Sequence, residues 1–180
     1  AGSFDAGGTK QPNAITFRSY VETGAIGSAS YNSPASISEA INIGQGYFFF
    51  FRGNRSNVTT TKVSDAGSGF AAAENWTATY IGNINTGAKE IIVTKTNNNN
   101  DGYEGYNLLG NPYPATLDFD LFQAGNSGVL SNTLSIIRRD RQGYLTRSNG
   151  IVNYAPTLIG IPSGTPPENI RFIQPGQGFF

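Results

Sequence analysis

Two carboxylates stand two residues apart in the segment DFDLFQA, residues 118 to 124. In an extended chain, Asp118 and Asp120 would share one face, where one could serve as a general acid and the other as a base. The same residues precede a short apolar stretch, and an acidic residue is favoured at the positive N-terminal end of a helix. The pattern therefore predicts a short helix with capping carboxylates, and it leaves a hydrolase site as an alternative.

The Asn-rich segment TNNNNDGYEG, residues 96 to 105, resembles a calcium-binding loop because Asn residues alternate before Asp101. An EF-hand loop would need a Glu eleven residues after its first ligand, and position 108 is Leu. An Asn-rich run followed by Asp-Gly is more typical of a hairpin loop. We therefore predict a hairpin loop here, with Asp101 and Glu104 as candidates for an irregular Ca²⁺ site.

Three aromatic residues are candidates for stacking on sugar rings. Trp76 is the only tryptophan, Tyr80 follows it by four residues, and Tyr144 lies in a later strand-like segment. Because Trp and Tyr combine an apolar body with one polar atom, a position in the core or at its rim is the competing interpretation.

Several classes of chemistry lack the residues that they need. The chain has no histidine and no cysteine, which excludes imidazole-dependent triads, thiolate nucleophiles and disulfides. Lys and Arg number 12, as do Asp and Glu, so no net charge attracts nucleic acid or an anionic membrane. Because the usual imidazole and thiolate ligands are absent, we expect no cofactor and no regular metal site.

The elements that would position these residues are mainly strands. Segments rich in β-branched and aromatic residues recur at short spacing between Gly, Asn, Pro and Ser clusters. The candidate strands are residues 14–20, 46–52, 58–63, 77–81, 89–95, 106–109, 134–138, 143–147, 151–154 and 170–173. Helical turns are expected only at 36–41 and 118–124. The pattern predicts one all-β domain over residues 1–180, a jelly-roll-like antiparallel sandwich of about ten strands.

The run GQGYFFFFRG, residues 44 to 53, is apolar on both faces of a strand. A strand that is covered on both sides has this pattern, so we predict a central buried strand in which Phe49→Asp unfolds the domain. The phrase nearly recurs as GQGFF at residues 176 to 180. We expect this second run to be a buried strand that is entered through a similar glycine turn.

The segment GYNLLGNPYP, residues 105–114, with the following ATLDFDLF, closely resembles a phrase of very large secreted surface proteins of Bacteroidota. That phrase occurs in regions that often lie upstream of the type IX secretion sorting domain. Three more phrases resemble those regions in the same order: GQGYFFFFRGNRS at 44–56, GNINTG at 82–87 and IQPGQGFF at 173–180. The family often has Trp where Phe119 stands, and residues 1–43 carry no such phrase.

This resemblance implies an extracellular or cell-surface module with an adhesive, structural or filament role and no catalytic residues. Family members usually continue beyond the final Phe-Phe pair, so we expect a fragment of a longer multidomain polypeptide. The expected partners are other domains of that polypeptide, neighbouring surface proteins, copies of itself or glycans, without nucleic acid or membrane insertion. A carbohydrate-binding module is the alternative function, and a glycoside hydrolase-type domain is the third.

Overall fold

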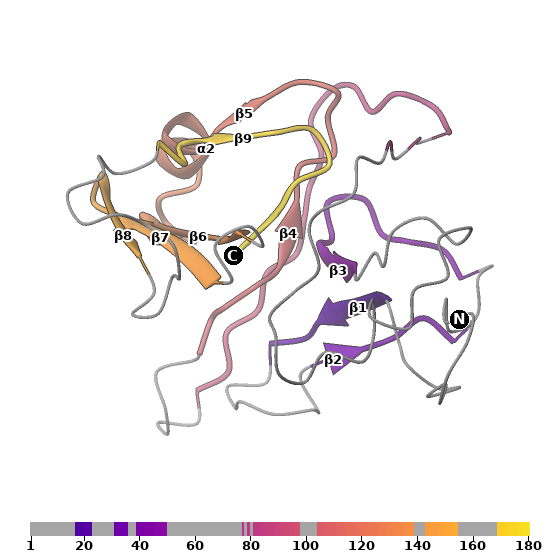
Figure 1. The fold of residues 1–180 in the computed structure, drawn as a ribbon, viewed down its shortest axis with the longest axis horizontal. Coiled ribbons are helices and arrows are strands. Elements are labelled where there is room, and N and C mark those ends of the chain that lie inside the picture. The colour runs from indigo at the N-terminus through magenta and orange to yellow at the C-terminus, as the bar shows by residue number, and fades with distance from the viewer. Residues whose placement is uncertain are drawn as a thin grey trace, which may run out of the picture.

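The structure is a computed structural model that describes residues 17–22, 31–35, 39–49, 77, 79, 81–97, 104–138, 143–154 and 169–180. These residues form ten strands and one helix (Figure 1). The strands are β1 (Phe17–Tyr20), β2 (Tyr31–Asn32), β3 (Tyr47–Phe49), β4 (Leu109–Gly110), β5 (Leu117–Asp118), β6 (Thr133–Arg138), β7 (Gly143–Ser148), β8 (Ile151–Tyr154), β9 (Phe172–Ile173) and β10 (Gly178–Phe179), and the helix is α2 (Phe119–Gly125). Within those ranges no helix has the length and apolar character that a membrane crossing needs.

The all-β prediction is confirmed, because small antiparallel sheets carry nearly all of the regular structure. β6, β7 and β8 form a meander in which Ser148 pairs with Ile151 across a two-residue turn. Both turn residues, Asn149 and Gly150, have positive φ, as the favoured type of hairpin turn requires. The second small sheet has the order β2–β1–β3. A jelly-roll-like sandwich remains a prediction.

The strand β4 lies between the two Gly-Gln-Gly phrases of the chain. On one edge, the backbone N–H of Gly46 donates to the carbonyl of Leu108 at 2.9 Å, and the N–H of Gly110 donates to the carbonyl of Gly44 at 2.8 Å. On the other edge β10 pairs antiparallel with β4, with Gly178 opposite Gly110. The phrase therefore recurs because both copies flank the same strand.

Close backbone approach explains why glycine occupies these phrases. A Cβ atom at Gly46 would lie 2.5 Å from the carbonyl oxygen of Leu109, closer than real contacts allow. Gly44 and Gly176, which open the two phrases, have φ of 78° and 70°, a region that L side chains rarely adopt.

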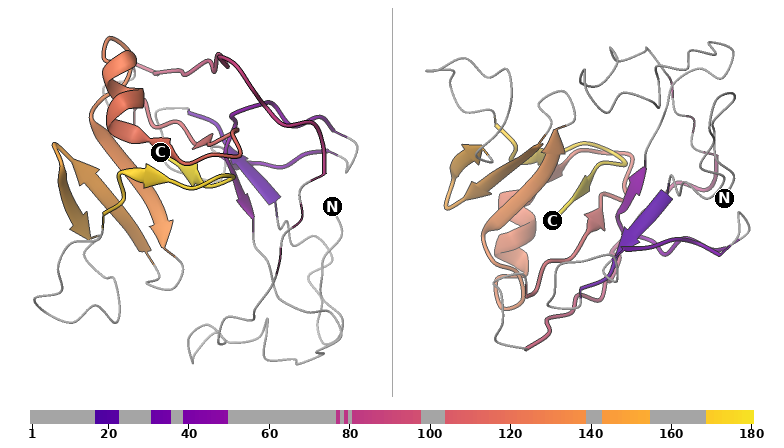
Figure 2. Two further views of the ribbon diagram at one scale, coloured as in Figure 1. Left: turned by 90° about the horizontal axis from the view of Figure 1, so that it is seen from above. Right: turned by 60° about the horizontal axis from the view of Figure 1, so that its bottom comes forward.

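Backbone hydrogen bonds join the small sheets edge to edge. Ser135 of β6 and Phe180 exchange two bonds of 2.8 Å, which place β10 between β4 and β6. Within residues 44–49, residues 44 and 46 form backbone hydrogen bonds with β4 and the residue before it, and residues 47–49 pair with β1. The resulting order is β2–β1–β3–β4–β10–β6–β7–β8, with the β1–β3 group and the β6–β8 group at opposite ends (Figures 1 and 2).

A second layer covers one face of the middle of this arrangement. β5 pairs with β9, and α2 follows β5 directly (Figure 1). The buried core lies between the layers and consists of Leu109, Phe119, Leu134, Ile136, Leu145, Ile170, Ile173 and Phe179. The burial of the second aromatic run is thereby confirmed at Phe179, which is 4% exposed.

The prediction for the first aromatic run is wrong at Phe49, which is 57% exposed. The two faces of β3 differ in what covers them. Phe48 packs against Tyr31 and Phe180, at ring-centroid distances of 5.6 and 5.8 Å, whereas the opposite face meets Phe17 of β1. Aromatic residues on both faces of a short strand therefore did not mean burial on both faces. Residues 50–53 of this run lie outside the described residues.

Several predicted elements differ from the structure. The segment 89–95 is not a strand. The side chain of Asn107 accepts a hydrogen bond from the N–H of Thr94 at 3.0 Å and donates one to the carbonyl of Thr94 at 2.8 Å. The Asn107 side chain thus takes the place that a neighbouring strand would have for Thr94. Residues 77, 79 and 81 are not in a strand, and 39–41 are not helical. The predicted strand 58–63 lies outside the described residues.

Candidate functional site

The paired carboxylates begin the helix, as the sequence predicts. Asp118 is the N-cap of α2, and its Oδ1 accepts a hydrogen bond from the backbone N–H of Asp120 at 3.0 Å. This bond satisfies one of the amide groups that the first helical turn leaves without a partner. Asp120 lies in the first turn, where the helix dipole favours an acidic side chain.

Two arginines bind these carboxylates in bidentate geometry. Arg171, next to β9, donates from Nε and Nη2 to the two oxygens of Asp118 at 2.8 and 2.6 Å. Arg147, on β7, donates from Nη1 and Nη2 to the two oxygens of Asp120 at 2.6 and 3.0 Å. A further ion pair joins Arg171 Nε to Asp120 at 3.2 Å. These four residues, the Asp–Arg cluster, connect α2 to both layers.

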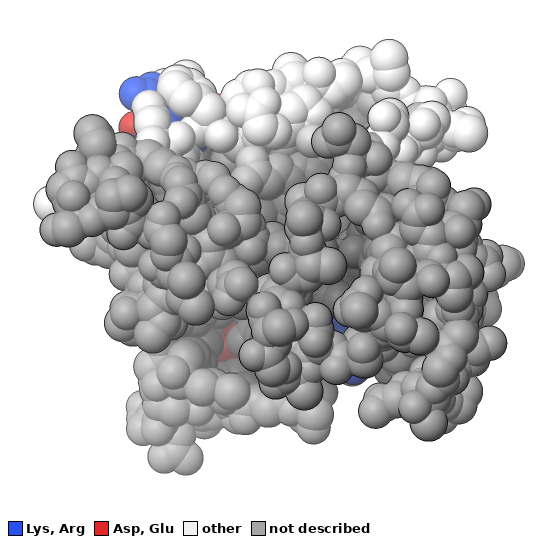
Figure 3. Space-filling view, viewed as in Figure 1, with Lys and Arg blue, Asp and Glu red and all other residues white. Residues whose placement is uncertain are grey.

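The electrostatics of the Asp–Arg cluster oppose general acid chemistry. The hydrogen bonds from Arg171 lower the pKa of Asp118, and those to Asp118 raise the pKa of Arg171. A carboxyl that acts as an acid near neutral pH needs a raised pKa, which burial in apolar surroundings provides. The geometry therefore favours a structural connection at this cluster. In Figure 3, basic and acidic atoms lie together at the upper left, the corner where Figure 1 places α2.

The sequence analysis assigned no role to Arg147 or Arg171. Each lies far along the chain from its carboxylate partner, and no spacing rule connects the residues. Strand pairing brings Arg171 to Asp118, because β5 and β9 place Asp118 opposite Phe172.

Asn111 is a second residue whose role the sequence did not reveal. It is 4% exposed, and its Nδ2 donates to the carbonyls of Ala115 and Ile173 at 2.8 and 3.0 Å. Its Oδ1 accepts from the N–H of Tyr113 at 3.1 Å. Two backbone bonds connect Asn111 to the turn that precedes β10. One amide side chain thus holds the NPYP turn against β9, and only its place between Gly and Pro gave a signal.

The phrase GNINTG contacts the same turn. Asn85 Nδ2 donates to the carbonyl of Pro112 at 2.9 Å, and the hydroxyl of Tyr113 donates to the carbonyl of Gly87 at 2.9 Å. Both Gly-Gln-Gly phrases, GNINTG and NPYP therefore lie in a continuous set of contacts around β4.

Tyr144 belongs to a group of aromatic rings around Phe180, the aromatic cluster. Phe180 contacts Tyr20, Phe48, Tyr106 and Tyr144 at centroid distances of 5.2, 5.8, 6.4 and 6.3 Å, and Tyr31 contacts Tyr20 and Phe48. Burial raises the pKa of Tyr144, whose side chain is still 38% exposed. The ring planes of Tyr144 and Tyr106 are tilted 61° and 67° from that of Phe180, so the rings do not form a coplanar row.

Of the remaining candidates from the sequence, Glu104 lies in the part of the chain that the structure describes. Trp76, Tyr80 and Asp101 lie outside the described residues. Glu104 lines a cavity with Lys95 and Tyr106. In the part of the chain that the structure describes, no group of three His, Cys, Asp or Glu residues is placed to hold a metal ion.

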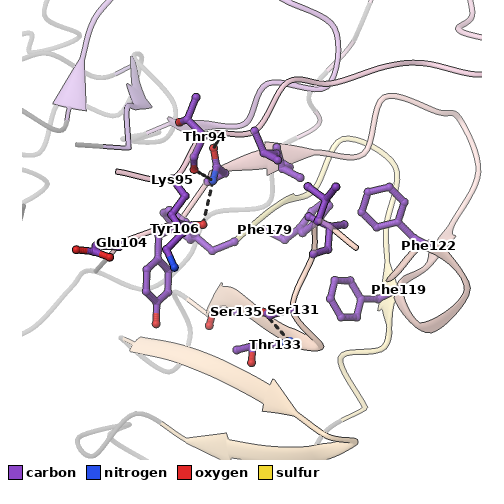
Figure 4. Close-up of a pocket in the computed structure, with 17 residues that line it drawn as sticks. Thr94, Lys95, Glu104, Tyr106, Phe119, Phe122, Ser131, Thr133, Ser135 and Phe179 are labelled. Carbon is purple, nitrogen blue, oxygen red and sulfur yellow. Dashed lines mark hydrogen bonds between the residues drawn. The ribbon is translucent and has the colours of Figure 1, made fainter. Parts of the chain in front are cut away.

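The cavity beside Glu104 has a volume of about 490 Å³ (Figure 4). Phe119, Phe122 and Phe179 line one side, and Tyr106 lies at the other. Ser131, Thr133 and Ser135, in and just before β6, line a third side. The lining joins apolar rings with hydroxyl groups and includes the charged side chains of Lys95 and Glu104 at the end beside Tyr106.

Comparisons with protein-family models, curated proteins and solved structures found no match for this chain.

Proposed function

We propose that the chain is a non-catalytic extracellular module with an adhesive, structural or filament role in a large secreted surface protein. The observation that carries the proposal is the Asp–Arg cluster. Both carboxylates that could have served a hydrolase, Asp118 and Asp120, are each held by two hydrogen bonds from an arginine. Carboxylates that are paired with arginines, and that join a helix to two layers in this way, support a structural role better than a catalytic one.

The positions of the sequence phrases support the same proposal. The phrases that resemble Bacteroidota surface proteins meet around β4 through backbone bonds and the side chains of Asn85, Asn111 and Tyr113. The need to build this fold is enough to account for these phrases, so no ligand has to be invoked to explain the resemblance. We further propose that the layers form a β-sandwich, and that its natural setting is the cell surface or the medium, beside other domains of one polypeptide.

A carbohydrate-binding module is the second candidate, and half-exposed Tyr106 and Tyr144 favour it. Their side chains are 41% and 38% exposed on the same cluster. Sugar platforms use aromatic faces that lie open to the ligand, and here both rings meet Phe180 edge to face. This tilt favours mutual packing over a flat platform.

A glycan array probed with the 180-residue chain separates the two candidates. We expect no specific binding, and Tyr144→Ala and Tyr106→Ala should give the same array as the unaltered chain. Specific micromolar binding that either substitution removes would establish the carbohydrate-binding function instead.

A second experiment tests the location of the module by labelling intact producing cells with antibodies against it. Labelling only after cell lysis would contradict a surface role.

A further inference from the structure

Phenol groups are the main targets that this chain offers to an oxidant. The sequence contains nine tyrosines and one tryptophan, and it has no cysteine and no methionine, the side chains on which protein oxidation usually begins. It has no histidine either. A one-electron oxidant therefore reacts mainly with tyrosines here, and the fold determines which of their rings lie close enough to react with each other.

Tyr20 and Tyr31 form a pair across two strands of the β2–β1–β3 sheet. They lie directly opposite each other where β1 and β2 pair antiparallel (Figure 1). Residues in this relationship direct their side chains to the same face of a sheet. Their ring centroids are 5.6 Å apart and their ring planes differ by 71°, so the edge of one ring meets the face of the other. Both residues are only partly buried.

Tyr144 brings a third phenol to this pair. Burial is the largest cause that raises the pKa of Tyr144, and the nearby phenols of Tyr31 and Tyr20 raise it further. Tyr20 and Tyr144 also contact the same ring, that of Phe180, at centroid distances of 5.2 and 6.3 Å. Tyr144 is 38% exposed, so it offers a surface phenol from which a radical can pass to the more covered pair.

We propose that Tyr20 and Tyr31 are an oxidative modification site, where a haem peroxidase and hydrogen peroxide join the two rings as dityrosine. Each phenol loses one electron and one proton and becomes a phenoxyl radical. The two radicals form a bond between the ring carbons next to their oxygens, and the hydrogen on each of these carbons moves to the oxygen and restores the phenol. Hydrogen peroxide takes up the two electrons and two protons and yields two molecules of water.

The link would connect β1 to β2 covalently. β2 has only two residues, Tyr31 and Asn32, so the pairing of these strands depends on few backbone hydrogen bonds. A cross-link between Tyr20 and Tyr31 closes a short loop and restricts the unfolded chain, as a disulfide does in chains that contain cysteine. This modification goes beyond the proposed surface function and does not depend on it.

The test oxidises the folded 180-residue chain with a haem peroxidase and hydrogen peroxide. Cleavage after Glu22 and Glu39 with a glutamate-specific protease places the two tyrosines on different peptides. We expect mass spectrometry to find these peptides joined with the loss of two hydrogens, and dityrosine fluorescence in chains that remain monomeric. The oxidised chain should have a Tm about 5 °C higher than the untreated chain.

Tyr31→Phe keeps the aromatic ring and removes the phenol, so it should lose the joined peptides and the rise in Tm. Tyr113→Phe is the matched control, because Tyr113 lies outside the aromatic cluster, and it should form the same link as the unaltered chain. Oxidation in urea should lower the yield of the link about tenfold, since unfolding removes the proximity of the rings. As much within-chain dityrosine in Tyr31→Phe, links only between chains, or a link from Tyr20 to Tyr144 instead would overturn the proposal.

Discussion

Arg171 holds Asp118 through two hydrogen bonds, from Nε at 2.8 Å and from Nη2 at 2.6 Å, and Asp118 at the same time caps α2. One carboxylate therefore joins the start of a helix to the strand β9. Because the helix also carries Phe119 and Phe122 to the core, this contact controls how the second layer lies on the sheet.

Asp118→Asn should lower the stability of the domain at pH 7 and have little effect in acid. The lowered pKa of Asp118 means that its contribution is present above the ordinary carboxyl pKa and is lost as pH falls through the lowered value. Urea unfolding at pH 7 and at an acidic pH below the lowered pKa measures both ends of this range. The exposed Glu90→Gln is the control and should show no such convergence. A deficit of equal size at both pH values would mean that the charge of Asp118 is irrelevant.

Asn111→Asp should destabilise the domain by about 3 kcal/mol, because a carboxylate cannot donate to the carbonyls of Ala115 and Ile173 and leaves both buried acceptors unsatisfied. Equilibrium unfolding in urea measures the loss. Asn83→Asp changes the same atoms at an exposed position and should stay within about 0.5 kcal/mol of the unaltered chain. Equal stability of the two variants would show that the hydrogen bonds from the Asn111 side chain do not stabilise the NPYP turn against β9.

Gly46→Ala should cost about 2 kcal/mol, since the new methyl group would lie 2.5 Å from the carbonyl oxygen of Leu109 and 2.7 Å from Cγ of Leu108. Thermal unfolding followed by circular dichroism gives the change. Gly128→Ala is matched to it, because nothing lies within 4 Å of the added carbon there. If both alanines are tolerated alike, close approach at β4 does not explain the first Gly-Gln-Gly phrase.

The sequence predicted elements whose cause is local. The meander β6–β7–β8 follows from β-branched runs with an Asn-Gly turn, and α2 follows from an acidic cap before apolar residues at helical spacing. Both arise from contacts within a few residues, so the pattern along the chain contains the information.

The contacts that shape the candidate sites depend on pairing over long distances along the chain. Arg147 meets Asp120 only because β7 lies beneath α2, and Asn107 takes the place of a strand neighbour for Thr94. Composition alone could not distinguish the buried ring of Phe179 from the exposed ring of Phe49. That difference depends on which strand edges and faces are covered after the sheet has assembled.

Phe48→Asp and Phe49→Asp, two adjacent changes of the same kind, should have very different effects. The ring of Phe48 lies among Tyr31 and Phe180, so a charge there breaks the aromatic cluster and should cost about 3 kcal/mol. Phe49 is 57% exposed, so its replacement should cost about 1 kcal/mol and leave the domain folded. Urea unfolding of both variants provides the comparison. The opposite result, in which Phe49→Asp unfolds the domain and Phe48→Asp is tolerated, would mean that the Phe49 face of β3 is the covered one. It would also restore the sequence-based prediction that Phe49→Asp unfolds the domain.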